Sequence, residues 1–433
     1  MLSATPPPKA LLLAGAAAAV AALVYLRRRR ALPPARRARI AVVGCGGWAQ
    51  GWHLPNISNR PDAQLVALVD PADDPGAGGC LHGRVESMSD LAARYGVPRY
   101  KTLQALLEER RDELDGVLVA APHGHHCSLG LAVLEAGLHL LLEKPMCADV
   151  GEARALAAAA TASPQLALLV NNTANWQPGF LEARKAVRQG VLGEVRSVSC
   201  VFAAPLGWLF EGADHVRWSR SEGSMRGNGF GWGQLSHTFA WVFGVTGLTP
   251  ATVFAAAVHS ESTGADIHDA LTLTCTNGAV IAVCGAGTAP DAGFKVVANW
   301  VFGTRGMLHY GGLAGSDGAA PGADGDGSAA ARRASAVTAA QAKGARLQVW
   351  RHDGAHSAGA PFAFESLDQA GPGPGSLHAF VSACRGEEYE VGAGPVEGLK
   401  AVAAIDALYR SIRSGKPESV AGCEGFSESR VAA

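Results

Sequence analysis

The sequence predicts an α/β protein with an N-terminal Rossmann domain, a doubly wound parallel sheet, followed by a C-terminal α+β domain with an open, largely antiparallel sheet. Three observations support this fold class. The 433 residues exceed what one compact core usually holds. Short apolar runs alternate with helical segments over residues 38–172, which is typical of parallel strands buried on both faces. Beyond residue 180 the strand-like runs lengthen and fewer helices separate them.

The first half should contain five strands connected by helices. Each strand is a short, continuously apolar run, and each helix is a longer segment such as the alanine-rich stretch before residue 163. The expected strands are residues 40–43, 64–69, 116–121, 138–142 and 166–170. The expected helices are residues 90–95, 102–110, 129–136 and 150–162. This half spans residues 38–172.

The second half, residues 173–433, should combine long strands with a few helices. Asn277-Gly278 separates two strand-like runs, which is a strong signal for a tight hairpin. A Gly/Ala/Asp-rich tract predicts a flexible insertion over about residues 312–345. The expected strands are residues 195–202, 251–259, 270–276 and 279–285, with helices at residues 181–189 and 397–412.

Overall charge and cysteine content exclude two classes of protein. Lys and Arg together number 37 against 38 Asp and Glu, a net charge of -1, so the chain lacks the basic character of a nucleic-acid binder. The nine cysteines are odd in number and form no C-x-x-C pair, which argues against a disulfide framework.

The first 37 residues form a basic leader around an uncharged apolar run at residues 10–26. A single-pass membrane anchor is one interpretation, and the arginines after the run would then keep the catalytic part on the cytoplasmic side. A cleaved transit peptide to an organelle is an alternative, because the leader is rich in Ala and Arg and lacks acids. A secretory signal is a third, although only Lys9 precedes the run. We expect membrane attachment through residues 10–26.

A glycine-rich turn follows the first expected strand. Gly44, Gly46 and Ala49 match the G-x-G-x-x-A fingerprint, and Asp70 ends the second strand. The first glycine allows the tight turn, and the second lets the backbone approach a pyrophosphate. A carboxylate at Asp70 would accept the ribose hydroxyls and repel a 2′-phosphate, which favours NAD, with NADP as the alternative cofactor.

The chain resembles the Gfo/Idh/MocA oxidoreductases. The resemblance rests on RIAVVGCGGWAQGWHLPNI, on Asp70, and on DGVLVAAPHGHHCSLGLAVLEAGLHLLLEKPM, with Glu143-Lys144-Pro145 as its strongest mark. It covers about residues 38–310 and the closing helix, and it implies a nicotinamide site and a substrate pocket between the two halves. The residues expected at the cofactor are Gly44, Gly46, Gly47, Trp48, Ala49, Asp70, Pro122, His126, Glu143 and Lys144.

The resemblance also implies the catalytic pair. Lys144 would hydrogen-bond the reacting oxygen, and His237 would transfer the proton, since histidine titrates near neutrality. The match around His237 is imperfect, because Gly233 stands where the family has an aspartate. This departure leaves both groups without a carboxylate partner from that segment.

Four side chains are candidate substrate contacts, and a metal site is not expected. Amides and an indole suit a hydroxylated ring. The candidates are Asn172, Asn175, Trp176 and Gln234. His123, His125 and Cys127 cluster in the sequence, but their spacing points the side chains in different directions, so we assign no metal.

The predicted function is transfer of a hydride between NAD(P) and a hydroxyl or carbonyl carbon of a sugar, cyclitol or cyclic diol. The alternative is a catalytically weak dinucleotide-binding sensor or scaffold at a membrane, suggested by Gly233. The expected partners are a small-molecule substrate and a second copy of the chain, bound through the C-terminal sheet.

Overall fold

The computed structural model describes residues 36–75, 85–211, 227–290, 294–313, 345–364 and 373–426. The chain divides into two units, residues 1–37 and 38–433, and the second contains nearly all the described residues. Almost the whole predicted leader and most of the predicted insertion, about residues 312–345, lie outside the described residues. Those two predictions are therefore not tested here.

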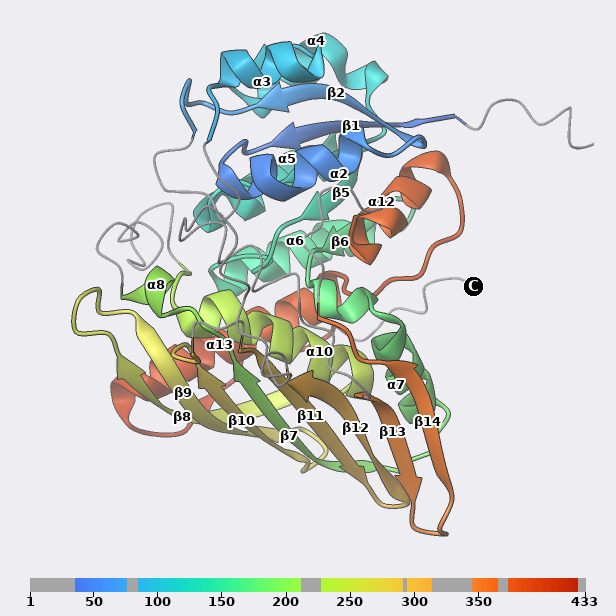
Figure 1. The fold of residues 1–433 in the computed structure, drawn as a ribbon, viewed down its shortest axis with the longest axis vertical. Coiled ribbons are helices and arrows are strands. Elements are labelled where there is room, and N and C mark those ends of the chain that lie inside the picture. Colours follow the sequence, from blue (N-terminus) through green and yellow to red (C-terminus); the bar gives the residue numbers. More distant parts are fainter. Residues whose placement is uncertain are drawn as a thin grey trace, which may run out of the picture. The chain divides into compact units, whose positions relative to one another are not determined.

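Sheet A is a six-stranded parallel sheet in the order β3-β2-β1-β4-β5-β6 (Figure 1). This is the doubly wound order. Strands β1 to β3 are added toward one edge of the sheet and β4 to β6 toward the other, and the change of side between β1 and β4 leaves a crevice at the carboxyl ends of these two strands. The prediction of a Rossmann sheet is confirmed. Its strands are β1 (Ala38–Val43), β2 (Ala63–Val69), β3 (Arg99–Tyr100), β4 (Gly116–Val119), β5 (His139–Leu142) and β6 (Leu168–Val170).

Side chains that cap the helix N-termini fix where several helices of this half begin. Ser87, Thr102 and Asp149 each accept a hydrogen bond from the backbone N–H three residues later, as good N-cap residues do. The predicted helices therefore appear with only small shifts at their ends. They are α3 (Met88–Tyr95), α4 (Leu103–Arg110), α5 (His126–Glu135) and α6 (Val150–Ala162), and the structure adds a short helix, α2 (Leu54–Ser58).

A helix from the C-terminal part of the chain, α12 (Gly375–Arg385), packs on sheet A beside β5 and β1 (Figure 1). Phe380 is fully buried there, against Gly116 of β4. A Cβ on Gly116 would lie 2.7 Å from both the Phe380 ring and the Cys384 sulfur, so glycine lets the helix approach closely. Residues 173–433 were predicted as one domain, yet this segment completes the core of the other half.

Sheet B has nine strands in the order β14-β13-β12-β11-β7-β10-β9-β8-β15. Only β7 and β10 pair in parallel, so the predicted largely antiparallel sheet is confirmed. Asn277-Gly278 forms the predicted hairpin between β9 and β10, with Gly278 at a φ of +81°. The strands are β7 (Val195–Ala203), β8 (Pro250–His259), β9 (Asp266–Cys275), β10 (Val280–Ala286), β11 (Val296–Gly303), β12 (Gly306–Leu313), β13 (Arg346–Arg351), β14 (His356–Pro361) and β15 (Glu418–Ser419).

Helices cover one face of sheet B and lie between it and the Rossmann half (Figure 1). Alternate residues of β9 and β10 are buried against these helices and exposed on the other side, as expected for a sheet with one covered face. The helices are α7 (Pro178–Arg188), α8 (Gly207–Phe210), α10 (Ser236–Thr246) and α13 (Pro395–Ser414).

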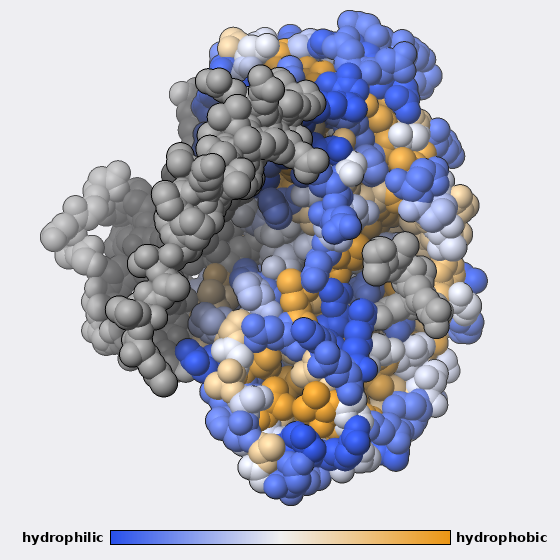
Figure 2. All heavy atoms as spheres, turned by 90° about the vertical axis from the view of Figure 1, so that its right-hand side faces the viewer, coloured by the Kyte–Doolittle hydropathy of each residue, from blue (hydrophilic) through white to orange (hydrophobic). Residues whose placement is uncertain are grey.

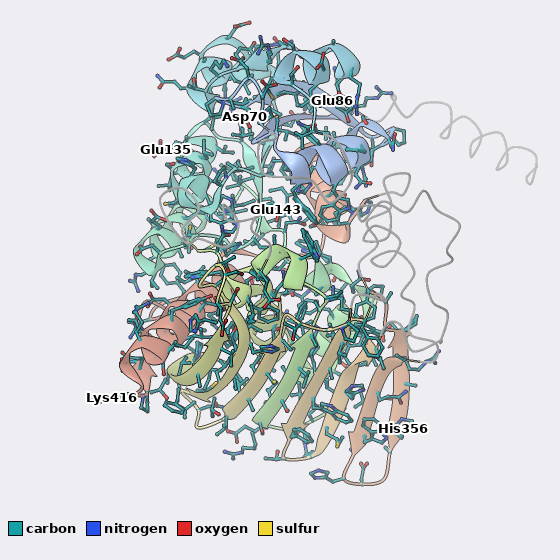
Figure 3. All side chains as sticks on the ribbon, turned by 60° about the vertical axis from the view of Figure 1, so that its left-hand side comes forward. Asp70, Glu86, Glu135, Glu143, His356 and Lys416 are labelled. Carbon is teal, nitrogen blue, oxygen red and sulfur yellow. The ribbon has the colours of Figure 1, made fainter. Side chains whose placement is uncertain are left out.

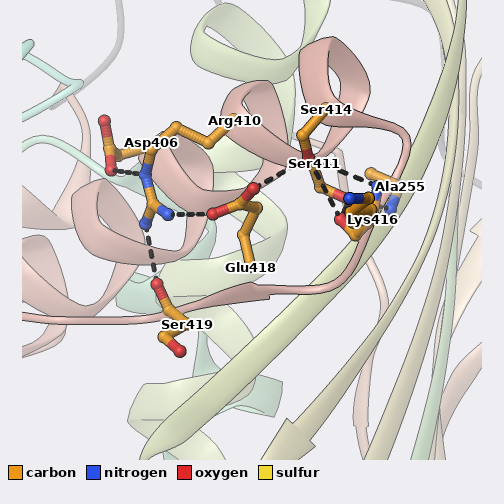
Figure 4. Close-up of polar contacts among 8 residues, drawn as sticks. All are labelled: Ala255, Asp406, Arg410, Ser411, Ser414, Lys416, Glu418 and Ser419. Atoms are coloured by element: carbon orange, nitrogen blue, oxygen red, sulfur yellow. Dashed lines mark hydrogen bonds and ion pairs between the residues drawn. The ribbon is translucent and has the colours of Figure 1, made fainter.

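Polar contacts hold the end of α13 against the edge of sheet B (Figure 4). Gly415 ends the helix at a φ of +66°, and the chain turns back to form β15. Arg410 donates to Asp406 at 2.8 Å and to Glu418 at 2.7 Å. These contacts fix α13, whose inner face carries part of the site described below.

The outer face of sheet B carries exposed apolar side chains. Phe254 is 48% exposed and Val258 59% exposed, and Val201, Val280 and Phe302 are also exposed. Trp300 stacks on Trp350 with ring centroids 6.3 Å apart. The side view in Figure 2 shows further apolar surface in its lower half, at the level of this sheet.

The predicted membrane location is wrong. Among the described residues, no helix is both long and apolar enough to cross a bilayer. Residues 10–26, the apolar run on which that prediction depended, are outside the described part of the chain.

The packing of α12 on sheet A predicts that Phe380→Ala strongly destabilises the protein. Removing a fully buried phenyl ring should cost about 3–5 kcal/mol of unfolding free energy, because both its burial and its packing are lost. Urea denaturation followed by circular dichroism measures the change. The control is Gln104→Ala on the exposed side of α4, which should shift the midpoint little, and equal effects of the two changes would contradict this packing.

Candidate functional site

The turn after β1 has the geometry of a dinucleotide fingerprint. Gly44 adopts a φ of +85°, and a Cβ there would lie 2.5 Å from the Ala121 nitrogen. A Cβ on Gly46 would meet nothing closer than 3.7 Å, so the backbone is open to an approaching phosphate. Ala49 then begins a helical π-turn, Ala49–His53, that continues into α2. These residues fit the pyrophosphate of a dinucleotide.

Asp70 lies at the carboxyl end of β2, in the upper Rossmann half (Figure 3). Its carboxylate accepts one hydrogen bond from the Cys45 N–H at 2.9 Å and one from the Ala72 N–H at 2.9 Å. Each carboxylate oxygen can accept further bonds, so the side chain is oriented and still able to bind hydroxyl groups. This arrangement fits the adenosine ribose of the cofactor.

Glu143, directly after β5, is the centre of a buried hydrogen-bond network (Figure 3). Its Oε1 accepts from Trp48 at 2.9 Å, His53 at 2.8 Å and Asn171 at 2.6 Å. Burial alone would raise the pKa of Glu143, but the His53 hydrogen bond, the charges of His53 and Lys144, and the Asn171 hydrogen bond lower it to about 2. Glu143 is therefore ionised and ties the first helix to the end of β5.

Lys144 reaches across to the second half of the protein. Its Nζ donates a hydrogen bond of 2.7 Å to the backbone oxygen of Gly233. Gly233 lies in the π-turn η7 (Gly231–Leu235), which continues into α10. Gly233 replaces the family's aspartate, and its backbone carbonyl still accepts a hydrogen bond from Lys144.

His126 lies against backbone carbonyls around the loop that carries Lys144, and His123 contacts the Gly227 oxygen in the second half of the chain. The His126 ring nitrogens lie 2.8 Å from the Pro145 oxygen and 2.9 Å from the Ala121 oxygen. Burial lowers the pKa of His126, and burial followed by the charges of His126 and Lys144 lowers that of His123 to about 3. Both rings are therefore neutral, and the contact of His126 with the Pro145 oxygen ties α5 to the loop.

His237 lies in the first turn of α10 and lines a pocket over the inner face of sheet B. Burial and the positive charges of Lys144 and Lys295 lower its pKa well below 6.5. The imidazole is neutral near pH 7 and can accept a proton. The pocket is lined by Thr173, Ala174, Gln177, Phe202, Gln234, His237, Thr238, Trp241, Lys295, Val297, Asn299, Tyr310, Phe362, Ala363 and Phe364.

Several polar pocket residues were not predicted from the sequence, among them Lys295, Asn299 and Tyr310. The Lys295 ammonium lies 5.4 Å from the ring centroids of both Phe202 and Phe364. Asn299 and Tyr310 come from β11 and β12, and the Tyr310 hydroxyl is buried without a hydrogen-bond partner among the described residues. Inward-facing positions of these strands could have been identified had β11 and β12 themselves been predicted.

Only one of the four predicted substrate contacts, Gln234, lines this pocket. The Asn172 amide donates to the Ser236 oxygen, and the Asn175 amide donates to the Ala240 oxygen. Trp176 packs beside Gly375 and Gly392. These three side chains orient α10 and its surroundings instead of facing the pocket.

No group of three metal-ligating side chains is present among the described residues. Within the cluster considered from the sequence, His123 contacts the Gly227 oxygen at 3.0 Å and Cys127 donates to the Glu152 oxygen. These contacts give both side chains structural partners.

Known proteins match this chain in both sequence and fold. A dTDP-3,4-didehydro-2,6-dideoxy-alpha-D-glucose 3-reductase of Actinomadura kijaniata is 29% identical over 40% of this chain and 47% of its own. A D-apiose dehydrogenase of Paraburkholderia graminis is 28% identical over 36% of this chain and 38% of its own. The chain thus spans less than half the length of these relatives.

Solved structures match over far more of the chain. GenD2 from gentamicin A biosynthesis, in complex with NAD, has a TM-score of 0.65 and 21% identity, covering 90% of this chain and 99% of its own. A levoglucosan dehydrogenase in complex with NADH and levoglucosan has a TM-score of 0.63 and 16% identity, covering 89% and 100%. At these identities the matches establish the fold.

Two family models match consecutive parts of the chain. Residues 38–171 match the oxidoreductase family with an NAD-binding Rossmann fold, and residues 180–309 match the C-terminal domain of the same GFO/IDH/MocA group. The matched residues include the glycine turn, Glu143, Lys144 and His237. Together with the fold and the geometry above, these matches show that the chain belongs to the Gfo/Idh/MocA oxidoreductase family.

Proposed function

We propose that this protein is an NAD(P)-dependent oxidoreductase that transfers a hydride between nicotinamide and a hydroxyl or carbonyl carbon of a sugar, cyclitol or cyclic diol. The observation that carries the proposal is the contact of the Lys144 ammonium with the Gly233 carbonyl. It joins the end of the Rossmann sheet to the turn that presents Gln234 and His237 to the pocket.

When bound, the nicotinamide supplies the hydride acceptor or donor. The Lys144 ammonium, oriented by Gly233, would hydrogen-bond the reacting oxygen and stabilise its developing negative charge. The neutral His237 ring would take the hydroxyl proton during oxidation and return it during reduction. Replacement of the family's acid by Gly233 therefore leaves the lysine oriented, and we favour the enzyme over the sensor alternative.

The pocket favours a polar ring as substrate. Gln234, Asn299 and the Tyr310 hydroxyl supply hydrogen-bonding groups among aromatic walls. The matched relatives include proteins named for sugars such as apiose and levoglucosan. These two observations support a carbohydrate or a similar cyclic polyol.

Self-association through sheet B is part of the proposal. The outer face of the sheet exposes Phe254, Val258 and Phe302, and the stacked Trp300 and Trp350 are half-buried. Apolar area of this kind is costly to leave in water and is characteristic of interaction surfaces. A second copy of the chain would cover it.

Lys144→Ala should reduce kcat by about 10²–10⁴-fold, because the group that stabilises the reacting oxygen is lost. The affinity for NADH should stay within about twofold, since the glycine turn and Asp70 are unchanged. Activity would be assayed on a panel of polyols and sugars by NADH absorbance, with binding measured by fluorescence titration. Lys185→Ala, on the exposed side of α7, is the matched control, and full turnover in Lys144→Ala would rule out the assigned role.

Asp70→Ala should weaken NADH binding by about tenfold, because a hydrogen bond to a charged group contributes about 1.5–3 kcal/mol. NADPH binding should become tighter, since the carboxylate that would repel its 2′-phosphate is removed. Both affinities are measurable by tryptophan quenching, with Asp353→Ala in the distant β13–β14 turn as control. A wild-type protein that prefers NADPH would contradict the role given to Asp70.

Light scattering should give the wild-type protein a mass that is a multiple of 44.5 kDa. Phe302→Glu should shift the mass toward the monomer, because a buried unpaired charge would destabilise the interface. Gln104→Glu, on exposed α4, is the control and should leave the mass unchanged. A monomeric wild-type protein would exclude this part of the proposal.

A further inference from the structure

Two carboxyl groups are buried beneath the turn that leads to His237. Asp266 is 3% exposed and Asp269 is 2% exposed, and both belong to β9. No lysine, arginine or histidine among the described residues contacts either carboxyl. Charged groups are rarely buried without a compensating partner, so this pair requires an explanation.

Asp266 accepts hydrogen bonds at the start of η7. Its Oδ2 accepts the Gly231 N–H at 2.7 Å, and its two oxygens accept from the Tyr409 hydroxyl at 2.9 and 3.0 Å. The same hydroxyl accepts the Trp232 N–H at 3.3 Å, and the Tyr409 ring stacks on Trp232. The first N–H groups of a helical segment have no preceding turn whose carbonyls could accept them. Asp266 and Tyr409 supply the missing acceptors for Gly231 and Trp232.

Asp269 has a different environment. Neither of its oxygens has a conventional hydrogen-bond donor among the described residues. Its cross-strand neighbours are Gly285 of β10 and Ala257 of β8, which offer no polar side chain. The polar group next to it is the Asp266 carboxyl. Two adjacent buried carboxylates repel each other when both are ionised, which is energetically unfavourable. If one of them keeps its proton, it can donate a hydrogen bond to the other.

We propose that Asp269 is kept protonated and donates a hydrogen bond to an ionised Asp266, and that this singly charged pair anchors the helical segment that positions Gln234 and His237. Both aspartates are positioning residues, because neither lines the pocket. A negative charge near the N-terminus of a helix is favourable, so the single charge on Asp266 stabilises the start of this helical segment. The contacts within the chain support the anchoring role of the pair. Its expected effect on turnover rests on the proposed function.

The surroundings of the pair support this assignment. Burial, followed by the charge and hydrogen bond of Asp266, raises the pKa of Asp269 to about 9. Burial and the two aspartates also raise the pKa of Tyr409 well above 10, so it remains a hydrogen-bond donor.

The other titratable groups on the packed elements make contacts elsewhere. On β8, His259 is exposed, and on β9, His268 bonds Thr288. On α13, Arg410 is paired with Asp406 and Glu418, and the Lys400 ammonium binds the Gly247 and Leu248 oxygens. Glu211, which follows α8, accepts through its backbone oxygen from Ser262. The turn η7 has no titratable side chain, and His237 follows it on α10.

The pair makes stability depend on pH in a defined direction. The pKa of Asp269 is raised in the folded protein above its unfolded value near 4, so the folded state holds a proton that the unfolded chain releases. The resulting loss of stability grows as pH rises from about 4 to about 9 and is constant outside that window. An amide at position 269 donates the same hydrogen bond and has no proton to lose.

The test compares wild type, Asp269→Asn and Asp266→Asn in the full-length protein by thermal unfolding between pH 5 and 9. The Tm of Asp269→Asn relative to wild type should rise steadily with pH. Asp266→Asn should lower Tm throughout, because the charged acceptor for Gly231 and Tyr409 is lost. An offset for Asp269→Asn that stays constant or falls with pH, or failure of this variant to fold, would overturn the proposal.

Turnover provides the second readout. Asp269→Asn should keep kcat within about threefold, and Asp266→Asn should lower kcat by about 10–100-fold with NADH affinity unchanged, because the helical segment shifts. Equal losses of kcat in both variants would contradict the asymmetric roles. The unfolding measurements need no substrate. If no substrate is turned over by wild type, the proposed function fails while the Tm–pH comparison still decides the proton-sharing pair.

Discussion

The buried Glu143 carboxylate is the interaction on which the site depends. It accepts hydrogen bonds from Trp48 and His53 of the first helix and from Asn171 after β6, and its own backbone continues into Lys144. One charged group therefore fixes the helix at the glycine turn, the end of sheet A and the lysine loop together. Burial of a carboxylate is unfavourable unless such donors surround it, so the loop has few alternative positions.

The sequence was informative where local patterns determine structure. Five strands of sheet A and the β9–β10 hairpin have local signals, an apolar run or Asn277-Gly278, and the structure contains them, whereas the two-residue strand β3 has no apolar run and was not predicted. α12 was missed because packing on sheet A depends on Gly116, more than 250 residues earlier in the chain. β11 to β14 were missed for different reasons. β14 (HSAGAP) consists of small and polar residues that give a weak strand pattern, whereas β11 (VVANWVFG) carries a strand-like pattern that was overlooked.

The site residues also divide into those with a local sequence signal and those whose role depends on tertiary packing. The glycine turn, Asp70 and Lys144 occur in recognisable segments, and their surroundings fit the roles expected of them. Asn172 and Asn175 are the same kind of polar residue as Gln234, yet their amides bind the backbone of α10, and only Gln234 lines the pocket. Residue type alone could not separate these outcomes, because the direction of a side chain depends on tertiary packing.

Charge distribution connects the replacement at Gly233 to the buried aspartates. In the described pocket lining, Lys295 is the charged side chain and His237 is held neutral by burial and nearby lysines. A carboxylate at position 233 would favour the protonated ring, whereas a backbone carbonyl orients Lys144 without adding a full charge. Asp266 and Asp269 are buried outside the pocket lining, and Asp266 accepts a hydrogen bond from the Gly231 N–H at the start of this segment. Negative charge therefore positions the segment while His237 remains able to accept a proton.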